Sequence, residues 1–411
     1  MNLNYFIAKR LLGYVNNKNK ISSPIIKIAI ISISIGVMIM LVSMATGIGL
    51  QHKIREKISA FSGHILINNY DSNQSDITLE PISTNQEFYP KFTSVSGVNN
   101  VQAYASIGGI IRTVKDFEGF VYKGVDKQYD WSLFKPYLIE GKIPDFGVQK
   151  YNDSVVVSKL MSDRLELKLN DKFDAFFMRK DSDKPQRRVF KVAGIYDSGF
   201  QDFDKAYILG DLKMVQKLYK WNDTLVGGFE IILNDFNEID IKTNQIYHTI
   251  PPELNTQSIK DKFPLIFNWL QMFDFNILLI LVIIIFIAGL NMITTLLVMI
   301  LEKRQFIAMM KVLGANNKKL QNIFILQAAY IISLGLFIGN FLGLGLIYLQ
   351  KYTGFITLDP ETYYVSTAPV YLNFKHILLL NVGVMLAIVL MLLLPVLVIS
   401  KISPVKVLKY E

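Results

Sequence analysis

The stretch Ile277–Leu301 reads ILLILVIIIFIAGLNMITTLLVMIL, and none of its residues is Asp, Glu, Lys or Arg. A helix needs about 20 mainly apolar residues to cross the hydrocarbon core of a bilayer. The whole chain is 51% hydrophobic and 19% charged, whereas soluble domains are about 25% charged. The stretch therefore predicts a transmembrane helix, and the composition predicts a membrane protein around it.

Three further stretches pass the same length test: Ile28–Leu50, Ile323–Leu349 and Ile377–Ile399. The first is longer than the apolar region of a secretory signal, and no A-x-A cleavage pattern follows it, so we interpret it as a retained helix. The segment 51–265 has the composition of a soluble domain. The predicted fold class is a membrane α-helical protein with four transmembrane helices. A large extracytoplasmic α+β domain is expected between the first and second helices.

Lysine and arginine are concentrated on one side of the predicted spans. Residues 1–27 hold five basic residues and no acidic residue, and residues 302–320 hold five basic residues and one acidic residue. The segment 51–265, by contrast, holds 28 basic and 29 acidic residues. The positive-inside rule then places both termini in the cytoplasm and the long segment outside. We expect a multi-pass protein of the cell inner membrane, whose basic residues flank the spans and do not bind nucleic acid.

These boundaries divide the chain into cytoplasmic, membrane and periplasmic segments. In chain order they are an N-terminal cytoplasmic amphipathic segment (1–27), transmembrane helix 1 (28–50), the periplasmic α+β domain (51–265), transmembrane helix 2 (277–301), a cytoplasmic loop (302–320), transmembrane helix 3 (323–349), a short periplasmic loop (350–376), transmembrane helix 4 (377–399) and a cytoplasmic tail (400–411).

Within the outer segment, β-rich runs such as FEGFVYKGV (117–125), SVVVS (154–158) and KFDAFFMR (172–179) alternate with helix-like runs. The charged segment RKDSDKPQRR, Arg179–Arg188, lies between two predicted strands and therefore predicts a projecting hairpin. It is either a solvated loop or a contact for a periplasmic partner, since exposed tips often carry function. Its basic residues are Arg179, Lys180, Lys184, Arg187 and Arg188.

The sequence signatures of several enzyme classes are missing. The chain holds no GxxxxGK[ST] P-loop, no GxSxG, no kinase signature and no cysteine, and its four histidines form no HxxxH or HExxH pair. The stretches 277–301, 323–349 and 377–399 also lack the Asp, Glu, Lys or Arg that an ion-coupled carrier usually needs in mid-membrane. We therefore expect neither an enzyme nor an ion carrier, with no catalytic residue, no metal ligand and no cofactor in this chain.

The third apolar stretch contains GLFIGNFLGLG, in which Gly335, Gly339 and Gly343 form two overlapping GxxxG motifs. Glycines at this spacing lie on one helix face and let another helix approach closely. They predict a helix-packing face and carry no information about a substrate.

The first apolar stretch carries three methionines, Met38, Met40 and Met44. Methionine is flexible and polarizable, which suits irregular apolar ligands such as acyl chains. Ordinary packing or lipid contact is the competing interpretation of each methionine.

The loop between the second and third spans is basic and half apolar. It reads LEKRQFIAMMKVLGANNKK from Leu301 to Lys319, and helical spacing places its residues Phe306, Ile307, Met310 and Leu313 on one face. Gly314 is placed to end this helix, and Asn316 or Asn317 to begin the next one. Two interpretations are open: a helix that a partner pushes, or a connector that lies on the membrane surface.

A resemblance to a known family favours the first interpretation. EKRQFIAMMKVLGANNKKLQNIFILQA (302–328), the tail PVLVISKISPVKVLKYE (395–411) and the block from KIAIISISIGVM to SGHILI (27–67) resemble the lipoprotein-releasing permeases of the LolC/LolE family. Such permeases pair with a second copy or a paralogue on a dimer of a separate ABC ATPase, which binds the ATP and Mg. They lift lipoproteins out of the inner membrane and hand them to a soluble periplasmic carrier.

On this chain, the resemblance implies an ATPase-coupling helix at Arg304–Leu313 ended by Gly314, and an acyl-chain cavity along the outer half of Ile28–Leu50. It also leaves two alternatives from related permeases. One is the export of peptides or drugs, and the other is the activation of a cell-wall hydrolase outside the membrane.

Overall fold

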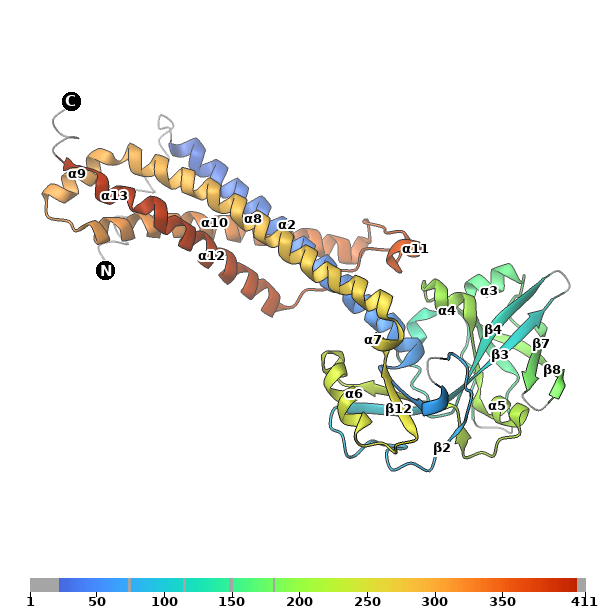
Figure 1. The fold of residues 1–411 in the computed structure, drawn as a ribbon. Helices are drawn as coiled ribbons and strands as arrows, with labels where there is room; N and C mark the ends of the chain where they lie inside the picture. Colours follow the sequence, from blue (N-terminus) through green and yellow to red (C-terminus); the bar gives the residue numbers. More distant parts are fainter. Residues whose placement is uncertain (1–21, 73–74, 114–115, 148–150, 180–181, 405–411) are drawn as a thin grey trace. The chain divides into compact units, whose positions relative to one another are not determined.

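The computed structural model describes residues 22–72, 75–113, 116–147, 151–179 and 182–404 (Figure 1). These residues fold into two compact units. The helical unit comprises the described parts of Met1–Gln51, Leu270–Thr357 and Thr367–Glu411, and the outer unit comprises those of His52–Trp269 and Leu358–Ser366.

Among the described residues, four helices are long and apolar enough to cross a membrane, and each overlaps one predicted span. They are α2 (Ser22–Ser62), α8 (Pro264–Glu302), α10 (Asn317–Thr353) and α12 (Phe374–Val396), and the short helices α9 (Arg304–Val312), α11 (Pro360–Tyr363) and α13 (Val398–Lys401) lie between or after them. The fourth predicted span, Ile377–Ile399, runs past the end of α12 into the short helix α13. The predicted fold class is confirmed. α8 begins at Pro264, well before the predicted start at Ile277, because proline is tolerated in the first helical turn.

A single hydrophobic core joins the helices of the helical unit. Each contributes fully buried side chains to it, for example Leu41 from α2, Met292 from α8, Ile307 from α9, Phe324 from α10 and Ile388 from α12. The short helix α9 is therefore part of the bundle and not a separate surface element.

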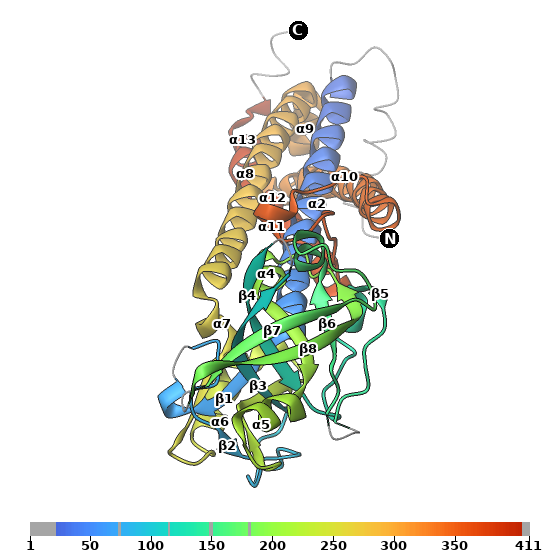
Figure 2. The ribbon, with the colours of Figure 1, turned by 90° about the vertical axis from the view of Figure 1, so that its right-hand side faces the viewer.

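The outer unit is built on a ten-stranded sheet in the order β12-β1-β11-β3-β4-β9-β6-β8-β5, with β7 paired to both β3 and β8. Figure 2 shows β7 and β8 side by side. Because β7 bridges these two strands, β3, β4, β9, β6, β8 and β7 close into a ring. The strands are β1 (Ile65–Asn69), β2 (Ile82–Ser83), β3 (Val98–Arg112), β4 (Phe117–Val125), β5 (Leu138–Gly141), β6 (Ser154–Ser158), β7 (Lys172–Arg179), β8 (Ser182–Tyr196), β9 (Tyr207–Asp211), β10 (Leu225–Val226), β11 (Gly228–Leu233) and β12 (Leu254–Ser258).

Short helices complete the outer unit. They are α3 (Lys159–Arg164), α4 (Gln201–Ala206), α5 (Leu212–Tyr219), α6 (Ile239–Tyr247) and α7 (Ile259–Lys262), with 3-10 turns at Tyr70–Ser72, Lys135–Tyr137 and Phe236–Glu238. Aromatic side chains pack inside the strand ring: Tyr122 stacks on Phe190 at 5.3 Å and meets Phe177 edge-on at 6.2 Å. Strand alternation places these residues on the inner face, as expected for a closed sheet.

The charged segment Arg179–Arg188 forms the predicted hairpin between two strands. β7 runs to Arg179 and β8 starts at Ser182, with Arg179 paired to Ser182, so most of the segment is strand and the connecting loop is shorter than expected. Extended pairing satisfies the backbone of this polar stretch, while Lys184 and Arg187 stay exposed.

Candidate functional site

The candidate site is α9, the short helix between the second and third long helices. Its end follows the Schellman pattern: Ala315 N–H donates to the Met310 carbonyl at 2.9 Å and Gly314 N–H to the Lys311 carbonyl at 3.0 Å. Gly314 adopts φ +88°, a conformation that glycine reaches without strain. The Asn316 side chain then caps α10 by accepting from Lys318 N–H. These local signals stop the helix after nine residues and start the next long helix.

The two faces of α9 have different roles. Ile307 and Ala308 are fully buried in the bundle core. On the opposite side, the exposed fractions of Met309, Val312 and Leu313 are 52%, 65% and 80%. An exposed apolar surface beside basic residues is chemically suited to bind in a groove on a partner protein.

This arrangement corrects the predicted contact face. Ile307 is buried and Met310 packs on the same core, so these two side chains point into the bundle and not toward a partner. Phe306 is half-buried, whereas Arg304 and Leu313 are exposed. The physical reason is that a helix joining two membrane helices must cover one apolar stripe with its own chain. The outward set is therefore Met309, Val312 and Leu313, which we call the α9 outer face.

The glycines of α10 lie against α2. A Cβ added to Gly339 would come within 2.7 Å of the Ser34 carbonyl oxygen and of Val37. One added to Gly335 would come within 2.7 Å of Ile33, and one on Gly343 would meet Leu41 at 3.0 Å. This face therefore lets the two helices approach more closely than any larger residue would allow.

The methionines of α2 are directed to the bundle. Met40 and Met44 are 1% and 8% exposed and belong to the core, and Met38 is half-buried beside Gly343. Met40 and Met44 thus contact packed protein in this conformation.

A stripe of isoleucines on α2 is exposed, as are other apolar side chains of the long helices. Ile28, Ile31, Ile35 and Ile39 are 61%, 57%, 45% and 43% exposed, at spacings of three and four residues. Such spacing keeps them on one face, which we call the α2 stripe. The spacing of these isoleucines is visible in the sequence, but the predicted acyl-chain contact was assigned to the methionines because of their flexible side chains.

Polar side chains join the long helices inside the apolar region. Asn340 and Asn381 exchange amide hydrogen bonds of 2.6 and 3.0 Å between α10 and α12. The Asn291 amide of α8 donates to the Ser32 hydroxyl of α2 at 2.7 Å. In a bilayer such pairs give helix packing its specificity. Sequence inspection for charged residues alone missed them.

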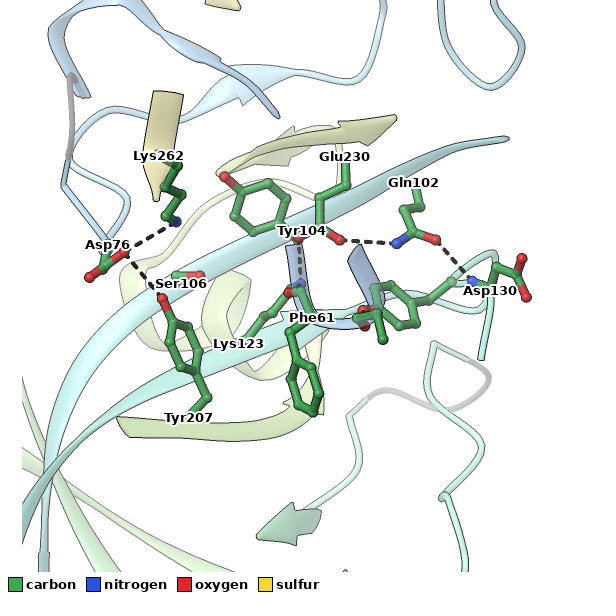
Figure 3. A network of polar contacts seen from close by, with 12 residues as sticks. Phe61, Asp76, Gln102, Tyr104, Ser106, Lys123, Asp130, Tyr207, Glu230 and Lys262 are labelled. Atoms are coloured by element: carbon green, nitrogen blue, oxygen red, sulfur yellow. Dashed lines mark hydrogen bonds and ion pairs between the residues drawn. The ribbon is translucent and has the colours of Figure 1, made fainter. Parts of the chain in front are cut away.

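The outer end of α2 is held by a buried ion pair (Figure 3). The Lys123 ammonium on β4 donates to the Phe61 carbonyl and to Glu230 on β11, both at 2.5 Å, and a Gln102 amide donates to Glu230 at 3.0 Å. Burial lowers the pKa of Lys123, and the Glu230 carboxylate opposes that shift. The tyrosine hydroxyl of Tyr129 donates to the Ala60 carbonyl at 3.3 Å. These donors satisfy the last carbonyls of α2, which have no partner within the helix.

Among the described residues, no group of three or more His, Cys, Asp or Glu side chains lies close enough together to hold a metal ion.

Comparison with known proteins relates the two units to a family. A sequence profile for the MacB-like periplasmic core domain matches residues 28–262, more than half of the chain, and one for the FtsX-like permease C-terminal region matches residues 278–404. The chain belongs to the ABC permeases built from these two modules.

This permease is similar along its whole length to curated relatives. It is 23% identical to the lipoprotein-releasing system transmembrane protein LolE of Haemophilus influenzae, over 99% of each chain. It is 21% identical to the LolC protein of Buchnera aphidicola, over 99% of this chain and 98% of the relative. The crystal structure of the periplasmic region of MacB from Actinobacillus actinomycetemcomitans covers 50% of the chain, at 15% identity and a TM-score of 0.34. The two matched sequence families, the relatives and the four long apolar helices make the permease a multi-pass inner-membrane protein with its α+β domain in the periplasm.

The periplasmic hairpin of the permease carries its basic residues on paired strands. Arg187 on β8 forms an ion pair of 2.9 Å with Asp174 on β7, and Lys184 is exposed. Arg179 and Arg188 are half-buried, and Lys180 lies outside the described residues. The outer surface of β3, β4, β7 and β8 beside the hairpin is an open hollow with exposed apolar side chains, among them Ile110, Phe117, Met178 and Val189.

The second periplasmic loop of the permease packs on the periplasmic domain, which the sequence did not indicate. Lys57 donates to the Tyr364 carbonyl at 2.7 Å, and the Tyr364 ring lies 4.8 Å from that of Phe200. Burial lowers the pKa of Lys57 to about 8. Residues Leu358–Ser366 therefore belong to the periplasmic domain although they connect the third and fourth long helices.

Proposed function

We propose that this chain is the permease subunit of an ABC transporter that releases lipoproteins from the inner membrane toward the outer membrane. A separate ATPase, which binds the ATP and Mg, would supply the energy. The observation that carries this proposal is the α9 outer face, an exposed apolar surface on a short helix within a basic loop. The lipoprotein cargo is suggested by the names of the full-length relatives.

The proposed action starts at α9. Met309, Val312 and Leu313 enter a groove on the ATPase, and closure of the ATPase dimer displaces the helix. Ile307 and Ala308 on the inner face are packed in the bundle core, so a displacement of α9 must also shift the long helices. α2 and α8 each begin in one compact unit and end in the other, which gives the movement a covalent route to the periplasmic domain.

The remaining partners would occupy other surfaces. We propose that the α2 stripe faces a second permease, either a copy or a paralogue, because exposed isoleucines on one face suit a helix as well as lipid. The acyl chains of the cargo would contact α2 at Met38, Met40 and Met44 and along the outer half of Ile28–Leu50; Met38 is the least buried of the three methionines. The β7–β8 hairpin and the hollow beside it would receive a soluble periplasmic carrier.

The test is Met309→Glu in the full-length permease co-expressed with its ATPase. Met309 is 52% exposed, so the change should leave folding intact, but it buries an unpaired charge in the proposed groove. We expect at least a roughly tenfold weaker association with the ATPase, and a comparable loss of lipoprotein release from spheroplasts. The measurements are co-purification and release of a labelled triacylated lipoprotein.

The matched control is Ile241→Glu, the same kind of change at a 63% exposed isoleucine on α6 of the periplasmic domain. It should leave both ATPase association and release unchanged. If Met309→Glu behaves like this control, α9 is a connector and the proposal is wrong.

A further inference from the structure

Lys311, near the end of α9, contacts a segment that is distant in the sequence. Its ammonium donates to the carbonyl oxygens of Ile399 at 2.7 Å, Ile402 at 2.9 Å and Ser400 at 3.4 Å. These carbonyls belong to α13 and to the residue that follows it. A four-residue helix cannot satisfy its own last carbonyls, so a cation at this end supplies donors that the backbone lacks.

Apolar contacts reinforce the same junction. Ile307 of α9 and Ile399 of α13 are both fully buried in the bundle core, and Met310 and Ile402 pack against that core. Burial lowers the pKa of Lys311, which indicates that its ammonium is partly withdrawn from water and depends on the carbonyl oxygens around it. α9 and α13 are thus joined by a polar centre with apolar packing around it.

The chain itself connects α9 only to α8 and α10. The fourth long helix, α12, contains Pro395 and is interrupted at Leu397, where α13 begins. Proline inside a helix removes a backbone hydrogen bond and permits a bend at this point. Without Lys311, movement of α9 could therefore reach the fourth span only through side-chain packing.

We propose that Lys311 is a positioning residue that makes α9 and α13 move as one piece, so that a displacement of α9 by the ATPase is delivered directly to the fourth span. The inference rests on the proposed function, because it needs a partner that moves α9. A displacement of α9 would then reach three elements: α8 and α10 through the chain itself, and α13 through Lys311. The Lys311 side chain points away from the α9 outer face, so this output is separable from ATPase binding.

The first test compares Lys311→Met with Lys311→Arg in the full transporter with its ATPase. Methionine keeps the length and the apolar stem but removes every donor, whereas arginine keeps the charge and the donors. For Lys311→Met we expect normal co-purification with the ATPase and continued ATP hydrolysis. Lipoprotein released per ATP hydrolysed should fall at least about tenfold, since hydrogen bonds from a charged donor are lost. Lys311→Arg should restore most of the ratio.

The second test replaces the hydrogen bonds of Lys311 by a covalent crosslink between α9 and α13. The chain has no cysteine, so Lys311→Cys with Ser400→Cys gives a unique thiol pair. A short cleavable bifunctional thiol reagent should restore release per ATP in this double variant, and cleavage of the reagent should abolish it again. A residue that only stabilised α13 would not give this reversible rescue of coupling.

Three outcomes would overturn the inference: a wild-type ratio in Lys311→Met, loss of ATPase binding in that variant, or failure of the crosslink to restore coupling. Failure of the proposed function shows itself elsewhere, in the wild-type permease, as an absence of ATPase association or of lipoprotein release.

Discussion

At the scale of single residues, two lysines each donate hydrogen bonds to backbone carbonyls at the end of a helix. Lys123 supplies a donor to the last carbonyls of α2, and Lys311 supplies donors to those of α13. Lys123 is paired with Glu230 and is 2% exposed, whereas Lys311 is only partly buried. Removing Lys123 would leave a buried carboxylate uncompensated, so its loss threatens folding, while Lys311 can be varied in a folded protein.

One prediction concerns how the free energy of unfolding depends on pH, and it rests on His64. The Nδ1 atom of His64 accepts a hydrogen bond from Leu233 N–H at 2.9 Å. Burial lowers the pKa of His64 from 6.5 to about 4. Between these values the unfolded chain binds a proton that the folded domain does not, so the free energy of unfolding falls as the pH falls from about 6.5 to 4. The expected loss from this residue is on the order of 3 kcal/mol.

The measurement is thermal or denaturant unfolding of the full-length protein, followed by tryptophan fluorescence, since Trp131, Trp221 and Trp269 all lie in the periplasmic unit. His64→Asn keeps an acceptor and removes the titration. Burial raises the pKa of Asp204 to about 6, which acts in the same range with the opposite sign, so the difference between variant and wild type is the quantity to compare. An equal pH slope in both proteins would contradict the assignment.

At the scale of elements, the bundle depends on how closely α10 approaches α2. Glycines at a spacing of four give α10 a groove that α2 fills with backbone and β-branched side chains. The asparagine pair between α10 and α12 then fixes a second side of α10, next to the glycine face. α10 is therefore the central element of the bundle, and its two faces are specified by different chemistry.

Gly339→Leu tests this packing. A side chain at Gly339 would collide with the Ser34 carbonyl and Val37, at 2.7 Å from each. We expect a destabilisation of about 1–3 kcal/mol or failure to assemble, measured as the yield of monodisperse protein and its melting temperature in detergent. Gly345→Leu is the matched control on the same helix, because a Cβ there meets nothing within 4 Å. Equal yields and melting temperatures for the two variants would show that the glycine face is not packed against α2.

At the scale of the whole molecule, the charge distribution orients the chain. The basic segments 1–27 and 302–320 lie on one side of the predicted spans, and the nearly neutral segment 51–265 lies on the other. The periplasmic placement of the α+β domain puts the α9 outer face on the cytoplasmic side, where an ATPase has access to ATP. We propose that both termini are cytoplasmic as well.

The absence of cysteine makes this orientation directly measurable. Asn222→Cys in the periplasmic domain and Lys319→Cys before the third span are both at exposed positions. In intact spheroplasts, a membrane-impermeant maleimide should label the cysteine at position 222 and not the one at position 319, which should react only after permeabilisation. The reverse pattern would invert the topology and remove the basis for an ATPase at α9.

The sequence by itself determined the long helices, several strands and the junction between α9 and α10. Hydropathy over about 20 residues located all four long helices, and strands such as Phe117–Val125 and Lys172–Arg179 carried their own β-rich pattern. Gly314 and Asn316 marked the end of α9 and the start of α10. These features follow from interactions within a few residues of the chain. Strands β9 and β12 were missed because they are short and their stability comes from strands distant in the sequence.

Only the tertiary structure decided which faces are covered. Both Ile307 and Leu313 were assigned to one apolar face, yet the first is buried and the second is 80% exposed, because α13 and the core cover one side of α9. The same holds for Met40, for the pairing of Lys123 with Glu230, and for the carbonyls that Lys311 reaches. A periodic pattern indicates that a helix has an apolar stripe. Whether that stripe is buried depends on residues distant in the sequence, which the local sequence does not identify.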